Sequence, residues 1–367
     1  KIRFKYYYSY ICMVLYQERR RYGPTSSCIK FTQSTGNKLI KNQASNKITS
    51  GLLAGILNTM PKFYLIAEKR KFNFLFLLVF IVPFFTVFQA KAQLDTEFWF
   101  APPELTESTT PGTGGPRDRP IQLVVSTLEK PARIEILQPA DLTFVPIILD
   151  MPANETEIVN LTSFINRLES KPENSILKTG LYIKATNSIS AYYEIKSANN
   201  TDIFALKGAN ANGKKFYVPF QTHWNNATNL NGNLYTPTTF SSFDIVATDD
   251  STFVTVTPTK DLIGHQANVP FTFMLNRGQV YSCRAIDRFG ANHPAGSKIE
   301  STKEVAVTMK DDMLQFDITE QVAGADIAGD QLIPLEFLGT SYVLVKGGLN
   351  NNQDRAFIVA TEDNTII

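Results

Sequence analysis

The sequence predicts an all-β protein made of two tandem homologous antiparallel β units. After residue 120, short segments alternate apolar and polar residues with a period of two, as in Ala132–Leu137. Such alternation is typical of half-buried strands, because successive side chains point to opposite faces of a sheet. One helical turn is expected, at Leu161–Glu169, with Thr162 or Ser163 as its N-cap.

Self-similarity is the second observation that predicts this class. Phe243–Val256 (FDIVATDDSTFVTV) recurs almost unchanged at Phe357–Ile367 (FIVATEDNTII), at an offset of 113 residues. Three more segments recur in the same order at offsets between 116 and 124 residues: Ile134–Ile136 with Val254–Val256, Val145–Leu149 with Val269–Phe273, and Gly180–Ala191 with Gly296–Val307.

These offsets indicate a duplicated unit of about 110–120 residues, a size that suits a β-sandwich of short strands. A propeller-like arrangement of smaller blades is the alternative. Because Glu362–Ile367 opens a third copy and the sequence stops there, we expect further domains C-terminal to residue 367.

The first 92 residues differ from the rest. We interpret residues 1–59, which start at Lys1 and show no sustained period, as a disordered upstream extension of doubtful coding status. Residues 60–92 read as a signal peptide, with a positive Lys69–Lys71, an apolar run at Phe74–Phe88 and a small-x-small cleavage motif before Gln93. The apolar run is shorter than the ~20 residues that cross a bilayer. A retained N-terminal anchor is the alternative.

The exported body divides into three predicted parts. Residues 93–120 form a first strand and a polar loop, residues 121–250 the first β unit, and residues 251–367 the second β unit with the start of a truncated third copy. Within the first unit, we expect Leu181–Ala185 and Ile189–Ile195 to pair across a turn at Asn187-Ser188.

Charge and cysteine content exclude some classes. Residues 93–367 carry 21 Lys and Arg against 32 Asp and Glu, a formal charge of −11. An acidic body argues against nucleic acid, since neutralising phosphates needs clustered basic residues. Only Cys283 lies in this region, so no intrachain disulfide framework is expected there.

A family resemblance rests on several segments in a characteristic order. They are Thr96–Pro102, Arg119–Ile121, Leu275–Tyr281, Gly296–Ser301, Val305–Val307, Asp326–Pro334, Leu338–Tyr342 and Ala360–Thr365. Together they resemble the N-terminal domain of the IgGFc-binding protein family over residues 93–367. That family is named after an animal mucus protein that binds antibody Fc, and similar domains occur in large surface and secreted proteins of Bacteroidetes-type bacteria. The resemblance implies an extracellular, all-β, non-enzymatic binding or adhesion module, without implying Fc binding or any site residue.

Histidine and acidic residues are the candidates for a metal site. His223, His265 and His293 are far apart, form no metal-ligand spacing and are interpreted as solvated loop residues. The acidic pairs Asp249-Asp250 and Asp311-Asp312 are placed at strand ends or in loops, where carboxylates can bind Ca²⁺. Turn chemistry is favoured over metal binding, with Asp249-Asp250 in a tight hairpin.

Trp224 is the one candidate ligand residue. It lies in the Asn-rich segment Gln221–Tyr235, where an aromatic side chain could offer a large contact platform. A Trp that caps the core beneath its loop is the favoured interpretation.

The sequence therefore favours an exported cell-surface or secreted binding or adhesion module. Its ligand would be an extracellular protein or glycan, and no cofactor, nucleic acid or membrane span of the mature chain is expected. A structural stalk in a larger surface protein is the alternative, and a carbohydrate-active enzyme is less favoured because no catalytic motif is recognisable.

Overall fold

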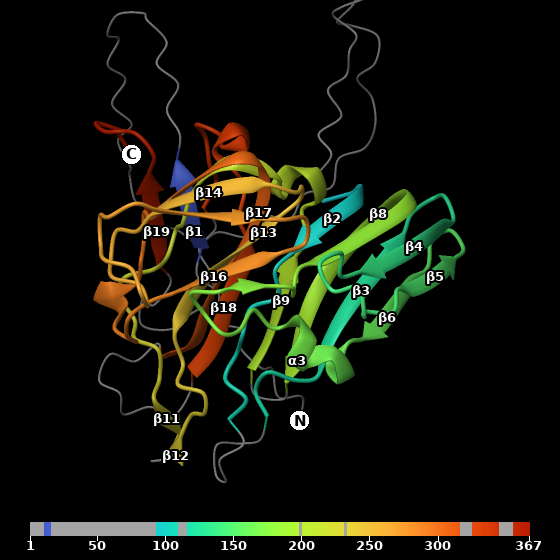
Figure 1. The fold of residues 1–367 in the computed structure, drawn as a ribbon, viewed down its shortest axis with the longest axis horizontal. Helices are drawn as coiled ribbons and strands as arrows, with labels where there is room; N and C mark the ends of the chain where they lie inside the picture. The colour runs from blue at the N-terminus through green and yellow to red at the C-terminus, as the bar shows by residue number, and fades with distance from the viewer. Residues whose placement is uncertain are drawn as a thin grey trace, which may run out of the picture. The chain divides into compact units, whose positions relative to one another are not determined.

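The computed structural model describes residues 11–15, 93–108, 116–197, 200–230, 233–315, 325–344 and 355–367. Within these ranges the predicted all-β class is confirmed, because strands fill two large sheets and α3 (Ile165–Leu168) is the only α-helix (Figure 1). No helix in the described part of the chain is long and apolar enough to cross a membrane. The predicted signal peptide lies outside the described residues, as does the predicted extension apart from β1 (Ile11–Leu15).

The first sheet is organised around one long strand, β8. Residues 181–185 of β8 pair with β4 and β2, and residues 189–197 pair with β3 and β9. Because β5 extends β4 and β6 extends β3, β8 is shared by two layers, β2-β8-β4-β5 and β9-β8-β3-β6. The strands are β2 (Asp95–Phe100), β3 (Ile121–Thr127), β4 (Ala132–Leu137), β5 (Ile147–Met151), β6 (Thr156–Asn160), β8 (Leu181–Ser197) and β9 (Asn200–Ala205).

Apolar side chains from both layers form one core. Phe98 of β2, Leu123 of β3, Ile134 of β4 and Tyr193 of β8 are all buried in the same cluster. The alternation seen in the sequence thus places one face of each strand inward, and we call this unit the first sandwich.

The hairpin predicted within residues 181–195 is wrong, because these residues lie in the single strand β8. Leu181–Ala185 and Ile189–Ile195 were expected to pair with each other, but they are successive parts of one strand. Each half finds its partners elsewhere in the chain, and the polar Asn187-Ser188 lies where β8 passes from one layer to the other. The helical turn is confirmed as η2 (Thr162–Phe164) followed by α3, but no side chain caps either helix. The Thr162 hydroxyl instead accepts a hydrogen bond from the Ile121 amide, at 3.1 Å.

The second sheet repeats this plan around β17. Its strands β10, β13, β14, β15, β16, β17 and β18 correspond in connectivity to β2, β3, β4, β5, β6, β8 and β9. β7, from the earlier part of the chain, adds to the edge at β16. The bounds are β7 (Ile176–Leu177), β10 (Gly213–Tyr217), β13 (Ser241–Ala247), β14 (Thr252–Thr257), β15 (Phe271–Leu275), β16 (Val280–Arg284), β17 (Lys298–Gln315) and β18 (Ala325–Gln331).

Pairing register supports the predicted duplication residue by residue. Ile134 faces Ala185 in the first sheet, and Val254, its equivalent in the repeat, faces Ser301 in the second. The second core gathers Phe216, Phe243, Val254 and Met309 from equivalent strands, so we call this unit the second sandwich. The predicted boundary at residue 250 falls between β13 and β14, which both belong to the second sandwich.

Several short elements lie outside the two large sheets. β11 (Asn229–Leu230) pairs with β12 (Asn233–Leu234), and β19 (Ala356–Ala360), which carries the last echo of the repeated motif, pairs in parallel with β1 outside both large sheets. The remaining 3-10 helices are η3 (Gly208–Ala211), η4 (Gly290–Asn292) and η5 (Leu335–Phe337).

The two sandwiches meet along a seam of large side chains. Trp99 stacks on Tyr182 with ring centroids 4.4 Å apart, and the Arg277 guanidinium lies 5.2 Å and 5.0 Å from the two centroids. Both rings belong to a buried cluster that includes Val246 of β13 and Ala306 of β17.

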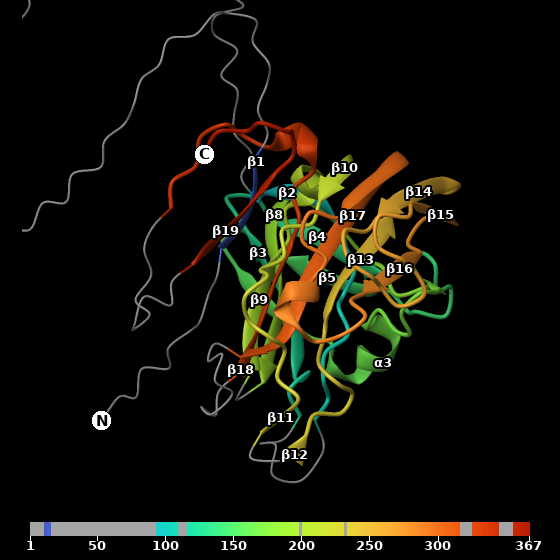
Figure 2. The ribbon, with the colours of Figure 1, turned by 90° about the vertical axis from the view of Figure 1, so that its left-hand side faces the viewer.

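A close strand approach extends this contact. β18 lies beside β9 (Figure 2), where Gly329 faces Phe204. A Cβ atom at Gly329 would lie 2.5 Å from the Phe204 ring, so glycine is needed for this approach.

Candidate functional sites

Asp249 and Asp250 lie exposed in a turn between β13 and β14. The Asp250 carboxylate accepts a hydrogen bond from the Arg277 amide at 3.0 Å, and the Thr252 hydroxyl donates to the Asp249 carbonyl at 2.7 Å. Ser251 follows in the left-handed region, with φ of 53°. Both residues therefore shape the local turn.

The predicted hairpin at this turn is wrong. β13 and β14 do not pair with each other, because both run antiparallel to β17, one after the other. The turn therefore interrupts the chain between β13 and β14, which run in the same direction along successive parts of β17. The first sandwich has the same interruption between β3 and β4 along β8, so the repeated motif marks the place where the chain passes from one layer to the other.

Asp311 is buried within β17, not at a strand end or in a loop as predicted. Its carboxylate lies 3.4 Å from Nδ1 of His293 and accepts hydrogen bonds from Gln221 at 3.2 Å and Asn226 at 3.1 Å. The Ser241 hydroxyl donates a further, short hydrogen bond. His293 is also fully buried, so its interpretation as a solvated loop residue is wrong.

The two groups of this pair shift each other's pKa toward the charged forms. Burial lowers the pKa of His293, but the Asp311 carboxylate and hydrogen bonds with the backbone of Gln221 and Arg288 together outweigh burial, so the net shift is upward. Burial raises the pKa of Asp311, but His293, Ser241 and Asn226 together lower it below its ordinary value. The pair is thus a buried ion pair with its hydrogen-bonding capacity well filled, as buried charges require.

Asp312 follows Asp311 in β17, and its side chain lies on the other face of the strand from the hydrogen bonds of Asp311. The pairing of β17 with β18 is irregular between Asp311 and Leu314, and Met313 has a φ of 50°. Asp312 Oδ2 accepts a hydrogen bond from the Thr106 amide at 2.8 Å, whereas Oδ1 has no hydrogen-bond partner. Burial raises the pKa of Asp312 to about 6, partly opposed by Lys310.

Two further buried charges, which sequence analysis missed, lie on the same face. Asp244 of β13 and Lys310 of β17 are both 0% exposed. Both carboxylate oxygens of Asp244 are buried without a hydrogen-bond partner, and so is Nζ of Lys310. We call Asp244, Lys310 and Asp312 the ionic cluster. The sequence contains one signal of this cluster. Asp244 in the second sandwich corresponds to the apolar Val124 in the first, so a charged residue stands at a position that is apolar in the other copy of the repeat.

Trp224 is 2% exposed and packs with Leu314 and Ala328. The Gln221 side chain accepts a hydrogen bond from the Trp224 amide at 2.7 Å and donates to its carbonyl at 2.8 Å. The Trp224 ring packs edge-on against the Phe357 ring, with the two centroids 5.6 Å apart. Trp224 therefore caps a small apolar cluster and does not present an open ligand platform.

The other histidines do not assemble a metal site. His265 stacks on Phe271 with centroids 3.4 Å apart, and its Nε2 lies 2.9 Å from the Tyr281 hydroxyl. His223 is exposed beside Trp224. Among the residues that the structure describes, no group of three or more His, Cys, Asp or Glu side chains is placed to hold a metal ion.

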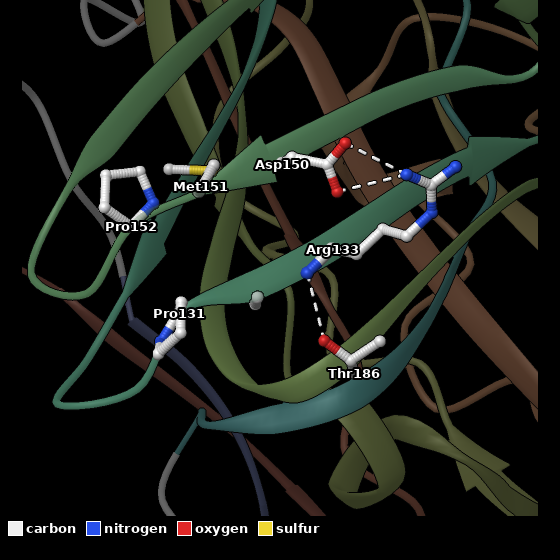
Figure 3. Close-up of a pocket in the computed structure, with 7 residues that line it drawn as sticks. Pro131, Arg133, Asp150, Met151, Pro152 and Thr186 are labelled. Atoms are coloured by element: carbon white, nitrogen blue, oxygen red, sulfur yellow. Dashed lines mark hydrogen bonds and ion pairs between the residues drawn. The ribbon is translucent and has the colours of Figure 1, made fainter.

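An open depression of about 420 Å³ lies on the outer face of β4 and β5 (Figure 3). Arg133 and Asp150 project over it and form an ion pair with an Nη1–Oδ2 distance of 2.9 Å. The Arg133 amide donates a hydrogen bond to the Thr186 hydroxyl at 3.0 Å, which fixes the strand at this point. The lining residues are Pro131, Ala132, Arg133, Asp150, Met151, Pro152 and Thr186.

The equivalent surface of the second sandwich has the same backbone geometry and different chemistry. The Phe253 amide donates to the Thr302 hydroxyl, again at 3.0 Å. Phe253 and Met274 face each other across β14 and β15, as Arg133 and Asp150 do across β4 and β5. Both apolar side chains are exposed, at 50% and 41%.

Comparison with known proteins gives one finding. The family described as IgGFc binding protein matches residues 204–367, which include all of the second sandwich except the short strand β7. A search of curated proteins and a search of solved structures each gave no match. Residues 204–367 are therefore similar to the IgGFc binding protein family.

Proposed function

We propose that this chain is an exported, non-catalytic binding or adhesion module that recognises an extracellular protein. The match of residues 204–367 to the IgGFc binding protein family carries this proposal. The tandem β-sandwiches support it, because such frameworks hold exposed surfaces rigidly while the core stays shielded.

Phe253 and Met274 form the surface that we propose for the ligand. They lie within the segment that matches the family, and they are exposed where the first sandwich has a charged pair. Aromatic and Met side chains are enriched in the centres of protein interfaces, where they contribute most when fully buried. Their exposure has no evident role in the fold, since the equivalent positions accept Arg133 and Asp150.

The test is a binding assay with immobilised full-length protein. Antibody Fc, mucin, a polysaccharide panel and an extract of cell-surface proteins are presented in turn. Phe253→Ser combined with Met274→Ser should weaken the binding at least about tenfold, since interface hot spots contribute more than about 1.4 kcal/mol. Arg133→Ser combined with Asp150→Ser is the matched control and should leave binding unchanged. Binding to none of these surfaces would remove the proposal's support.

Export is a separate arm of the proposal. The signal peptide predicted at residues 60–92 places the mature start at Gln93. N-terminal sequencing of protein recovered from the producing cells checks this. A start well upstream of Gln93, or recovery only from the cell interior, would contradict export.

A structural stalk is the second candidate function, and the seam favours it. The Trp99–Tyr182 stack under Arg277 and the hydrogen bond from Gln331 to the Trp99 carbonyl, at 2.6 Å, join the sandwiches without a free linker. Replacing the two sandwiches with an unrelated spacer of equal length distinguishes the functions. Full retention of adhesion after replacement supports the stalk, and loss supports the binding module.

A further inference from the structure

The ionic cluster has an unusual combination of burial and missing partners. Lys310 Nζ, both carboxylate oxygens of Asp244, and Oδ1 of Asp312 are buried without a hydrogen-bond partner. A buried polar group left unpaired costs about 1–3 kcal/mol, and more when it is charged. Charge pairs made for stability are normally saturated with hydrogen bonds, as at Asp311, so the cluster needs another explanation.

The strand register places Lys310 and Asp244 close together on one face of the sheet. Asp244 faces Thr308 and Lys310 faces Ser242 across the β13–β17 pair. Asp244 and Lys310 are therefore diagonal neighbours on one face of the sheet, within reach of a long side chain. Lys310 Nζ lies 3.4 Å from the centre of the Phe240 ring, and the charges of Lys310 and Asp244 act on each other's pKa.

The surroundings favour uncharged forms of both groups. Burial raises the pKa of Asp244 to about 7, although the nearby Ser282 hydroxyl and Lys310 lower it. Burial also lowers the pKa of Lys310, opposed by Asp312, Glu104 and Asp244, with Arg284 adding to the lowering. A neutral amine is a nucleophile, and a neutral carboxylic acid can lose hydroxide as water.

We propose that Lys310 and Asp244 condense into an intramolecular isopeptide bond that ties β17 to β13. Lys310 Nζ attacks Cγ of Asp244, a C–N bond forms, and one C–O bond breaks. The neutral amine gives up one hydrogen, the neutral carboxylic acid gives up its hydroxyl, and the two leave together as one water molecule. No oxidant or other reactant is needed.

Asp312 is the carboxyl group that we assign to proton transfer in this step. It is fully buried, its Oδ1 has no partner, and it exerts the largest favourable electrostatic effect on Lys310. The Thr106 amide holds its other oxygen in place. The pKa of Asp312, about 6, lies between those of an ordinary acid and an ordinary base, which suits a group that must both accept and return a proton near neutral pH.

The cross-link would fill the role of a disulfide in a region with a single cysteine. Residues 93–367 contain only Cys283, and that thiol is buried and free. A covalent bond between residues 244 and 310 closes a long loop that spans β14, β15 and β16, and loop closure of this kind stabilises a fold by restricting its unfolded chain.

Mass spectrometry of the intact, full-length protein tests the proposal. The wild type should be lighter than its sequence by the mass of one water molecule. After proteolysis, one branched peptide should join the segments that contain Lys310 and Asp244. Lys310→Arg, which keeps a long basic side chain but cannot form the amide, should have its full sequence mass and migrate more slowly on a denaturing gel.

Two further variants keep the test decisive if Lys310→Arg fails to fold. Asp244→Asn should still cross-link but lose ammonia instead of water, which a mass measurement distinguishes. Asp312→Asn should leave a measurable fraction of uncross-linked chain that decreases with time. Lys207 and Asp330 are the matched control pair: they are in contact at 2.6 Å, but Asp330 is half exposed, so they should stay unlinked. A wild type with its full sequence mass, or a cross-link elsewhere, would overturn the proposal.

Discussion

The two sandwiches share one topology and differ at one end. Where the first sandwich pairs Ile121 with Ile195, the second pairs Ser241 with Asp311. All four residues are buried. The comparison shows that the end of the core can be either apolar or ionic within one strand topology.

The difference depends on what covers that end. In the second sandwich, Gln221, Asn226 and His293 supply the hydrogen bonds and the positive charge that Asp311 requires. On the other face, the segment that contains Thr106 covers Asp312. An acidic side chain can therefore replace an apolar one only where a loop brings partners to it, since an unpaired buried charge is strongly destabilising.

The largest expected effect comes from removing the ion pair. Asp311→Ala should destabilise the protein by about 5 kcal/mol, the upper end for breaking a buried pair, because it leaves buried His293 without its carboxylate and removes the hydrogen bonds that Gln221 and Ser241 donate to Asp311. Urea unfolding followed by tryptophan fluorescence measures this change. Asp150→Ala, whose ion pair is exposed, is the control and should cost no more than about 1 kcal/mol. Equal costs would mean that the buried network contributes nothing special.

The seam should be nearly as sensitive. Trp99→Ala removes a buried ring that stacks on Tyr182 and lies under Arg277, so we expect a loss of about 4 kcal/mol in the free energy of unfolding. Tyr217 is the equivalent residue in the second sandwich and is only half buried. Tyr217→Ala should therefore cost clearly less in the same unfolding assay, and a similar cost would show that the seam does not distinguish the two copies.

Stability should decrease as the pH rises, through Glu169 of the first sandwich. Burial raises the pKa of Glu169 to about 7 from its ordinary 4.5, although Lys171 lowers it. Between these two values the folded state holds a proton that the unfolded state has released. Rising pH from about 4.5 to 7 should thus remove about 3 kcal/mol of this group's stabilising contribution.

Melting temperatures measured between pH 4.5 and 8 check this sign. Glu169→Gln cannot titrate and should give a flatter profile than the wild type. A wild-type profile that rises with pH, or one that Glu169→Gln leaves unchanged, would show that Glu169 is not the group responsible.

The smallest effect is expected on the exposed faces. Arg133→Phe combined with Asp150→Met copies the second sandwich's pair onto the first and should change the free energy of unfolding by less than about 1 kcal/mol, because these side chains are largely solvated. Chemical denaturation checks the stability, and the binding assay then shows whether the copied pair gains affinity for the ligand. A large loss of stability would mean that the pair at this position is required by the fold.

The sequence alone determined the all-β class and the duplication. The alternation in Ala132–Leu137 and the echo of Phe243–Val256 at Phe357–Ile367 are local signals, and a period of two fixes which face of a strand is buried. The same echo also indicated that Asp249 and Asp250 belong to a turn.

Only the tertiary structure decided which strands pair. Leu181–Ala185 and Ile189–Ile195 look like a hairpin, yet they form one strand, because β4 pairs with it from 45 to 51 residues away and β3 from 62 to 74 residues away. Partner choice in a sheet depends on such distant segments, which no local pattern encodes. For the same reason, Asp244, Lys310, Asp311 and His293 look like ordinary surface residues in the sequence. Burial and pairing are properties of the neighbours that folding brings to them.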